Sequence, residues 1–319
     1  MKYLITGGAG FIGSHLADAL VARGDKIIVL DNFITGNKNN LENIPNRELL
    51  QVVKGSILDV DTVSETVGEV DYVIHLAAAV GVFNIVEKPL DSLMTNLRGT
   101  ENILKSCLAQ NKPVFIASSS EVYGKNGGEP LNEESDRILG SPLKSRWSYA
   151  EAKAIDESMA YFYHLEKGLE VRMVRFFNTV GPRQSGDYGM VIPRFVAAAL
   201  KNQAIQVYGD GKQTRCFCHV SDAVNAVLTL LDQPKAVGQV FNIGNSEEVS
   251  MLELAKKVRT ITNSKSEINL VPYSEVYAVG FEDMRRRVPD ITKIRELIGW
   301  HPKMSLHEVI VDVANYLRK

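Results

Sequence analysis

The chain has 319 residues, of which 45% are hydrophobic and 23% charged, and its formal net charge is −2. That length allows one large domain or two interlocked domains with a sizeable core. The near-neutral charge gives no electrostatic basis for binding nucleic acid or an anionic membrane surface. The N-terminus lacks the apolar core of a signal peptide and no apolar stretch reaches membrane-spanning length, so we expect a cytoplasmic protein.

Cysteine and histidine spacing argues against a disulfide framework and against a metal site. Three cysteines, Cys107, Cys216 and Cys218, cannot all be paired within one chain. The Cys216-x-Cys218 spacing lacks the further ligands of a zinc site, and His219 has no companions at metal-ligand spacing. We therefore predict no bound metal, and cysteines that pack or line a pocket in a reducing compartment.

Short β-branched runs alternate with helical patterns through the first half of the chain. Strands are expected at Tyr3–Thr6, Lys26–Asp31, Val52–Lys54, Tyr72–Leu76, Val114–Ser118 and Val171–Arg175. Helices are expected at Phe11–Arg23, Val60–Val67, Thr95–Gln110 and Tyr149–Glu166. This alternation predicts right-handed βαβ units and an α/β fold with a Rossmann-type, doubly wound parallel sheet.

The pattern changes after Asn178. The sequence there predicts a loop over Gly181–Gly189, a helix over Pro193–Lys201, a turn at Gly209-Asp210-Gly211, and helices over Val220–Leu231 and Met251–Ile261. No flexible linker separates the two halves. We expect a Rossmann domain over residues 1–178, completed by parts of 216–246, and a smaller C-terminal lobe over 179–319.

A glycine triplet marks a dinucleotide site. Gly7, Gly10 and Gly13 follow the first strand and open the first helix, where glycine permits a tight turn and close approach of a pyrophosphate to the helix N-terminus. Asp31 ends the second strand, where a carboxylate accepts the ribose hydroxyls of NAD. The same charge would repel the 2′-phosphate of NADP. The sequence therefore predicts NAD as the cofactor.

Tyr149 and Lys153 are separated by four residues within a predicted helix, so their side chains project from one face. A free tyrosine has a pKa near 10, which is too high for a base at neutral pH. A neighbouring cation favours the phenolate and lowers that pKa. The pair by itself is also compatible with an ordinary surface helix, but its combination with the glycine turn and Asp31 indicates an oxidation site.

Several motifs together resemble the extended short-chain dehydrogenase/reductase family, and within it the nucleotide-sugar epimerases, decarboxylases and dehydratases. They are TGGAGFIGSHL from Thr6, Asp31-Asn32, HLAA from His75, SSSEVYG from Ser118, YAEAK from Tyr149, RFFNTVGPRQ from Arg175 and GDGKQTRCF from Gly209. The resemblance covers nearly the whole chain. It implies an NAD-binding Rossmann domain and a C-terminal lobe that binds a nucleotide sugar, with a UDP-sugar as substrate.

The resemblance also implies roles for individual residues. Those expected to contact the cofactor are Gly7, Gly10, Phe11, Ile12, Gly13, Asp31, Asn32, Thr35, Gly36, Asn37, Ser56, Ile57, Leu76, Ala77, Ala78, Asn96, Tyr149 and Lys153. Those expected to contact the substrate are Ser119, Tyr149, Asn178, Arg183, Val191, Val207 and Arg215. Ser119 is the expected catalytic partner of Tyr149. Ser56 stands where the family usually has Asp, so the adenine contact differs here.

The shared first step is oxidation of a sugar hydroxyl at C4 to a ketone. The fate of that ketone depends on Glu121. It joins Ser119, Tyr149 and Lys153 as an expected catalytic residue. The Ser-Ser-Glu of this chain resembles the Thr-Ser-Glu of UDP-glucuronate decarboxylases, whereas Ser120 replaces the acid typical of 4,6-dehydratases. The segment GPRQ followed by VIPRF resembles 4-epimerases instead. A structural role for Glu121 also stays open.

The sequence favours a UDP-sugar 4-epimerase slightly, with UDP-glucuronate decarboxylase as the alternative. A 4,6-dehydratase and a catalytically silent NAD-binding protein rank lower. The resemblance further implies a homodimer in which helices around Thr95–Gln110 and Tyr149–Glu166 form a four-helix bundle.

Other notable side chains have simpler interpretations. His75 is expected to end a strand and to be satisfied within the fold. Arg175 and Arg183 are expected to pack at the lobe interface, with Arg183 also placed to reach phosphate. The run Arg285-Arg286-Arg287 is usually solvated, although one of its arginines could contact a nucleotide.

Overall fold

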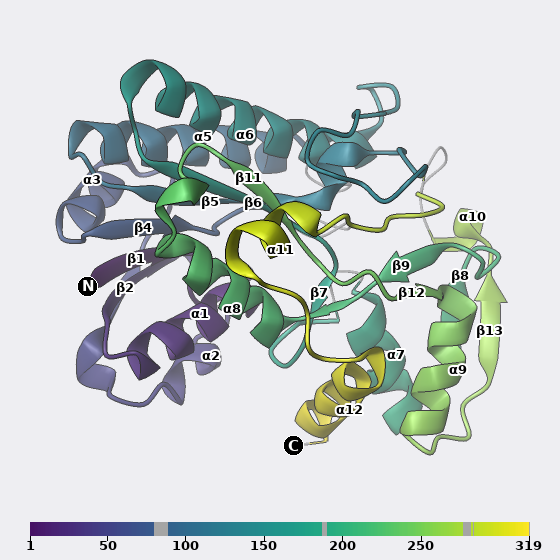
Figure 1. The fold of residues 1–319 in the computed structure, drawn as a ribbon. Coiled ribbons are helices and arrows are strands. Elements are labelled where there is room, and N and C mark those ends of the chain that lie inside the picture. The colour runs from purple at the N-terminus through teal and green to yellow at the C-terminus, as the bar shows by residue number, and fades with distance from the viewer. Residues whose placement is uncertain (80–88, 187–189, 277–281, 283, 319) are drawn as a thin grey trace.

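A seven-stranded, fully parallel sheet forms the centre of the computed structural model, which describes residues 1–79, 89–186, 190–276, 282 and 284–318 (Figure 1). The strand order is β11-β6-β5-β4-β1-β2-β3. The strands are β1 Lys2–Thr6, β2 Lys26–Asp31, β3 Leu50–Lys54, β4 Tyr72–His75, β5 Val114–Ser119, β6 Val171–Phe176 and β11 Val240–Ile243. The predicted Rossmann-type α/β fold is confirmed.

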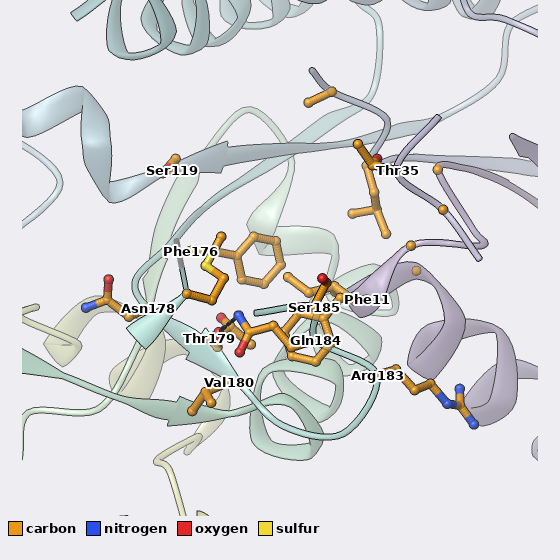
Figure 2. Close-up of a pocket in the computed structure, with 18 of the residues that line it drawn as sticks. Phe11, Thr35, Ser119, Phe176, Asn178, Thr179, Val180, Arg183, Gln184 and Ser185 are labelled. Atoms are coloured by element: carbon orange, nitrogen blue, oxygen red, sulfur yellow. Dashed lines mark hydrogen bonds between the residues drawn. The ribbon is translucent and has the colours of Figure 1, made fainter. Parts of the chain in front are cut away.

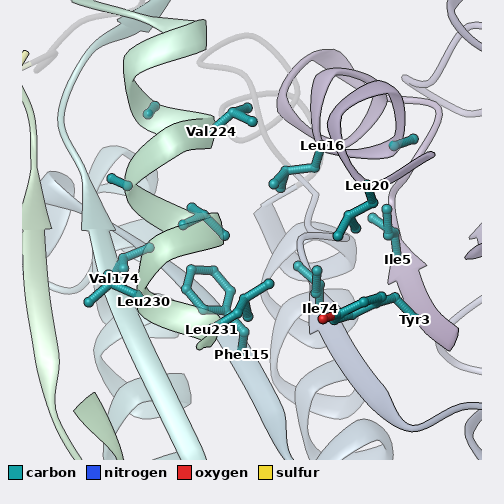
Figure 3. Packing of buried hydrophobic residues seen from close by; sticks show 14 of the residues in the cluster. Tyr3, Ile5, Leu16, Leu20, Ile74, Phe115, Val174, Val224, Leu230 and Leu231 are labelled. Atoms are coloured by element: carbon teal, nitrogen blue, oxygen red, sulfur yellow. The ribbon is translucent and has the colours of Figure 1, made fainter. Parts of the chain in front are cut away.

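Helices cover both faces of this sheet. The helices on one face are α3 Val60–Gly68, α5 Pro89–Ala109 and α6 Ser148–Lys167, and those on the other are α1 Phe11–Ala22, α8 Val220–Leu231 and α11 Thr292–Ile298. Figure 3 shows Leu16, Leu230 and Phe115 packed between α1, α8 and the sheet. Because β1, β2 and β4 are buried on both faces, their sequences are almost continuously apolar, whereas the edge strand β3 is largely exposed.

The predicted elements agree with the structure to within a few residues at most ends. The largest difference is α5, which begins at Pro89 and not near Thr95. Proline suits the first turn of a helix because its missing N–H would have no partner there. The remaining short elements near the sheet are α2 Asn39–Glu42 and the 3₁₀ turns η1 Arg47–Leu49, η2 Ser120–Tyr123, η3 Ser145–Trp147 and η4 Pro234–Ala236.

The second half of the chain contributes to both parts of the molecule. Strand β11 and helix α8 return to the central sheet, where β11 pairs with β6. A separate apolar core holds the lobe together, built on α7 Val191–Leu200, β8 Ile205–Tyr208, α9 Met251–Ile261, β13 Ile268–Val271 and α12 Leu306–Leu317. The lobe also contains β9 Thr214–Cys216, β12 Glu248–Ser250 and α10 Tyr273–Val276, while β7 Thr179–Val180 pairs with β10 Cys218–His219 beside it.

Part of the predicted loop over Gly181–Gly189 lies outside the described residues, namely 187–189. Cys107, Cys216 and Cys218 are buried free thiols, and burial raises the pKa of Cys107 and of Cys216 to about 12. Within the described ranges, no helix is long and apolar enough to cross a membrane. The same residues contain no group of three or more side chains arranged to hold a metal ion.

Candidate active site

A cavity of about 1650 Å³ lies at the carboxyl ends of the parallel strands, between the sheet and the lobe. Its lining comes from the β1–α1 turn, the ends of β2, β4, β5 and β6, the start of α6, and the lobe. Figure 2 shows Phe11 and Thr35 on one side of it and Ser119 and Asn178 on another. Single-ligand pockets usually measure about 300–1,000 Å³, so this cavity has room for two ligands side by side.

The β1–α1 turn presents bare backbone to the cavity. Gly7 has a positive φ of 70°, and a Cβ there would lie 2.9 Å from the backbone of Ala77. A Cβ on Gly13 would overlap the carbonyl of Gly7, so only glycine allows α1 to begin this close to the strand. The exposed N–H groups of the first turn of α1 therefore face the cavity, as a pyrophosphate requires.

Asp31 is fixed at the end of β2. Its carboxylate accepts hydrogen bonds from the N–H groups of Ala9 at 3.0 Å and Phe33 at 2.8 Å. A Cβ on Gly36 would lie 2.8 Å from the same carboxylate, so the loop after β2 approaches it closely. The glycine turn and this carboxylate fit a dinucleotide with free ribose hydroxyls.

Most residues predicted to contact the cofactor line the cavity. They are Gly7, Gly10, Phe11, Ile12, Gly13, Asp31, Asn32, Thr35, Gly36, Asn37, Ile57, Leu76, Ala77, Ala78, Tyr149 and Lys153. Ser56 and Asn96 do not line it. The Ser56 hydroxyl accepts a hydrogen bond from the N–H of Leu58, and the buried Asn96 side chain bonds the backbone N–H and carbonyl of Ala79 at 2.7 and 3.3 Å. Asn96 thus fixes the backbone that follows β4 without lining the cavity itself.

Tyr149, Ser119 and Lys153 meet at the end of β5, and the Tyr149 hydroxyl hydrogen-bonds the Ser119 side chain. Burial raises the pKa of Tyr149, and Lys153 lowers it by a smaller amount. Lys153 therefore lowers the pKa of Tyr149, as expected. The resulting pKa of Tyr149 nevertheless lies above the ordinary value for tyrosine, because burial has the larger effect. The cause is that the phenol is removed from water in a site that also contains the carboxylates of Glu121 and Asp156.

Lys153 has a buried partner that the sequence analysis did not consider. Its ammonium lies 3.0 Å from Asp156 Oδ2, and the two side chains are 3% and 0% exposed. Burial acts to lower the pKa of Lys153, but Asp156 and Tyr149 outweigh it and the pKa is raised. The i, i+3 spacing on one helix was the signal that could have identified Asp156.

Glu121 lies between two buried guanidiniums. Arg146 Nη1 is 2.7 Å from one carboxylate oxygen, and Arg287 Nη1 is 2.5 Å from the other. Burial alone would raise the pKa of Glu121, but the two arginines hold it well below its usual range. The two arginines therefore favour the ionised form of Glu121.

Arg287 corrects one expectation from the sequence. Arg285 is solvated as expected, with a side chain 76% exposed, but Arg287 is 7% exposed and lines the cavity. Its other terminal nitrogen donates to Asn178 Oδ1 at 2.9 Å, so it joins Glu121 to Asn178. No local pattern separates Arg287 from its neighbours in the run.

The expected substrate residues Asn178, Arg183, Val191 and Arg215 also line the cavity. Arg183 Nη2 is engaged 2.7 Å from Asp18 on α1, and in Figure 2 its side chain points away from the other labelled residues. Arg215 donates to the carbonyl of Met284 at 2.8 Å.

Val207 does not line the cavity, because it is fully buried in the lobe core. The next residue, Tyr208, lines it and carries the Arg194 guanidinium 3.8 Å from its ring centroid. Successive side chains of strand β8 point to opposite faces, so Val207 faces the lobe core while its neighbour Tyr208 faces the cavity.

Two further predicted residues have structural roles. His75 ends β4 and bonds Thr6 Oγ1 at 2.7 Å and Thr100 Oγ1 at 3.1 Å, while burial lowers its pKa to about 3. Arg175 donates from Nε and Nη2 to the carboxylate of Glu157 on α6, at 2.6–3.1 Å. This ion pair joins β6 to the helix that carries Tyr149 and Lys153.

The parallel sheet, the glycine turn and the Ser119–Tyr149–Lys153 set together define an NAD-dependent enzyme of the extended short-chain dehydrogenase/reductase class. The chain belongs to the family described as GDP-mannose 4,6 dehydratase, whose model matches residues 4–313. Its relatives and structural neighbours are NAD-dependent nucleotide-sugar epimerases, decarboxylases and dehydratases. NAD is the cofactor, and the protein is a nucleotide-sugar-modifying enzyme.

Relatives similar over the full chain include decarboxylases. The chain is 44% identical to UDP-N-acetyl-alpha-D-glucosaminuronate decarboxylase of Bacillus cytotoxicus, covering 100% of this chain and 98% of that protein. It is 37% identical to UDP-glucuronic acid decarboxylase 1 of Danio rerio, covering 100% of this chain and 73% of that protein.

Similar solved structures include epimerases. UDP-glucose 4-epimerase of Thermotoga maritima with UDP-glucose has a TM-score of 0.90 at 30% identity, covering 100% of this chain and 99% of that one. UDP-glucuronic acid 4-epimerase of Bacillus cereus, in complex with UDP-glucuronic acid and NAD, has a TM-score of 0.89 at 27% identity, with the same coverage.

Proposed function

We propose that the protein is an NAD-dependent decarboxylase of UDP-linked uronic acids. The sequence placed 4-epimerisation slightly ahead, and the similar solved structures include 4-epimerases at 27–30% identity. The decarboxylases are more similar in sequence, at 37–44% identity over the whole chain, and they favour the alternative.

The charge distribution around Glu121 carries the proposal. Arg146 and Arg287 both line the cavity, and both contact the carboxylate of Glu121. Guanidiniums at a cavity wall can bind the carboxylate of a ligand through paired hydrogen bonds. A nucleotide sugar with a carboxylate at C5 carries one more negative charge than a UDP-sugar whose sugar ring is uncharged. The site is therefore better matched to a uronic acid.

Tyr149 can remove the proton from the C4 hydroxyl as that carbon is oxidised, with Ser119 orienting the oxygen and Lys153 stabilising the phenolate. NAD, when bound, supplies the reversible two-electron oxidation of C4. The 4-ketone turns the C5 carboxylate into that of a β-keto acid. The bond between C5 and the carboxylate then breaks, its electron pair passes into the enolate of the ketone, and carbon dioxide leaves.

A proton from water adds to C5, and reduction of the ketone, with return of the Tyr149 proton to the C4 oxygen, completes the reaction. Glu121 is engaged by two arginines, which favour its ionised form. It holds the N–H groups of Arg146 and Arg287 in place beside Tyr149. The arginines can then bind the C5 carboxylate before carbon dioxide leaves.

A substrate panel tests the proposal. The protein is incubated with NAD and, separately, UDP-glucuronate, UDP-N-acetylglucosaminuronate and UDP-glucose, and the products are identified by NMR and mass spectrometry. We expect loss of carbon dioxide from at least one uronate and no conversion of UDP-glucose. Products inverted at C4 that keep the carboxylate would establish a 4-epimerase, and no turnover of any substrate would favour a silent NAD-binding protein.

We also propose a homodimer built on α5 and α6. The outer face of α6 exposes Ile155, Phe162 and Leu165, whose residues are 46%, 50% and 63% exposed, and Leu90 of α5 is 69% exposed. Exposed apolar side chains on two helices that pack side by side suit a symmetric four-helix interface. Light scattering at micromolar concentration should give twice the chain mass, and Phe162→Glu should give a monomer. Leu143→Glu, at a residue 93% exposed elsewhere, is the matched control and should stay dimeric.

A further inference from the structure

Asp156 is a buried carboxylate directly behind the proposed catalytic pair. It lies on α6 one turn after Lys153, is fully buried, and does not line the cavity, whereas Lys153 does. Its Oδ2 accepts the Lys153 ammonium at 3.0 Å. We propose that Asp156 is a positioning residue that keeps Lys153 charged and aimed at the cofactor site before NAD binds.

The cost of burying Asp156 argues that it is retained for this contact. Its Oδ1 is buried and has no hydrogen-bond partner among the described residues, so the carboxylate is only partly satisfied. Such a group destabilises a helix–sheet interface relative to an apolar side chain of similar size. The other buried positions of α6 are four alanines and two charged residues, Lys153 and Glu157, and each of these two has an ion-pair partner.

The other ionisable groups around Lys153 do not replace Asp156. On η2, Glu121 is engaged by Arg146 of η3 and by Arg287. On α6, Glu157 is engaged by Arg175 of β6. The remaining neighbours are His75 on β4, which is neutral, and the phenol of Tyr149. Asp156 is therefore the carboxylate in direct contact with the ammonium. It is the largest of the influences that oppose the effect of burial on the pKa of Lys153.

The inference rests on the proposed roles of Tyr149 and Lys153 but not on which sugar reacts. Asp156→Asn keeps the shape and one acceptor while removing the charge. Binding of NAD to the cofactor-free protein, measured by calorimetry from neutral to alkaline pH, should weaken about tenfold. The pH at which NAD binding is lost on the alkaline side should fall by about one unit, and so should the pH at which turnover is lost. One unit is the lower end of the pKa shift that an opposite charge in contact with a group such as Lys153 produces.

Controls separate this role from a purely structural one. Glu166→Gln removes the same charge from the exposed end of α6 and should leave both profiles unchanged, while Asp156→Glu should restore part of the alkaline limb. Thermal unfolding checks that each variant is folded, and Asp156→Ser replaces Asp156→Asn in the same assays if the latter is unstable. Wild-type NAD affinity and an unmoved alkaline limb in the charge-free variant would overturn the proposal. Because NAD binding is measured without sugar, failure of the substrate panel would leave this result intact.

Discussion

Tyr149→Phe is expected to lower turnover by about 10²–10⁴-fold, the usual contribution of a positioned acid or base. The phenol hydrogen-bonds Ser119 and lies beside Lys153 at the end of β5, where the hydroxyl to be oxidised must bind. Phenylalanine keeps the ring and removes only the group that exchanges the proton. NAD affinity, measured by calorimetry, should change little, because the glycine turn and Asp31 are untouched.

The matched control is Tyr161→Phe on the same helix, where the residue is 42% exposed and lies on the outer face. Its turnover should equal that of the wild type. If Tyr149→Phe kept full activity on the substrate identified by the panel, Tyr149 would not be the base. If it also lost NAD binding, the defect would be in assembly of the site and not in proton transfer.

Arg175→Met is expected to lower the free energy of unfolding by about 3–5 kcal/mol, the usual effect of removing one partner from a buried ion pair. Arg175 donates to Glu157 at 2.6–3.1 Å, to the Tyr123 hydroxyl at 2.9 Å and to the carbonyl of Glu133 at 2.8 Å. Without it, Glu157 becomes a buried carboxylate whose remaining hydrogen bond comes from Ser118. Urea unfolding at fixed NAD concentration measures the change.

Arg172→Met provides the comparison on the same strand. Arg172 is also buried, but its carboxylate neighbour Glu170 is 61% exposed and stays hydrated when the arginine is lost. Its removal should cost only about 1–3 kcal/mol, for the unpaired hydroxyl of Tyr72 and carbonyl of Gln233. Arg175→Met combined with Glu157→Gln should recover part of the lost stability. Glu157→Gln alone completes the cycle, and single costs that simply add in the double variant would show that the ion pair contributes no coupling.

Local sequence patterns predicted the architecture because each element carries its own signal. Helices α8 and α9 have the predicted ends, Val220–Leu231 and Met251–Ile261, and strand β2 has the predicted ends Lys26–Asp31. In these segments, apolar periodicity and the flanking cap and turn residues point to the same boundaries. The start of α5 was misjudged because the residues before Thr95 are less regularly apolar, while Pro89 allowed the helix to begin earlier.

The catalytic end of the site could be predicted from the sequence for a geometric reason. In a parallel sheet, the carboxyl ends of the strands share one edge, so the Gly7 turn, Asp31 and Ser119 were expected near one another. The helical spacing of Tyr149 and Lys153 then placed both side chains on one face toward that edge. The pKa of Tyr149 was less accessible, because burial outweighs the effect of Lys153 and depends on everything packed around the phenol.

By itself, then, the sequence determined the Rossmann sheet, the NAD site and the Tyr149–Lys153 pair, since each depends on spacing within one or two elements. The tertiary structure decided the substrate side of the cavity. Arg287 reaches Glu121 across 166 positions of the chain, and Tyr208 lines the cavity while Val207 is buried. Such contacts depend on how the lobe packs against the sheet and on the register of one strand. No local pattern encodes either, because both are set by the summed packing of distant segments.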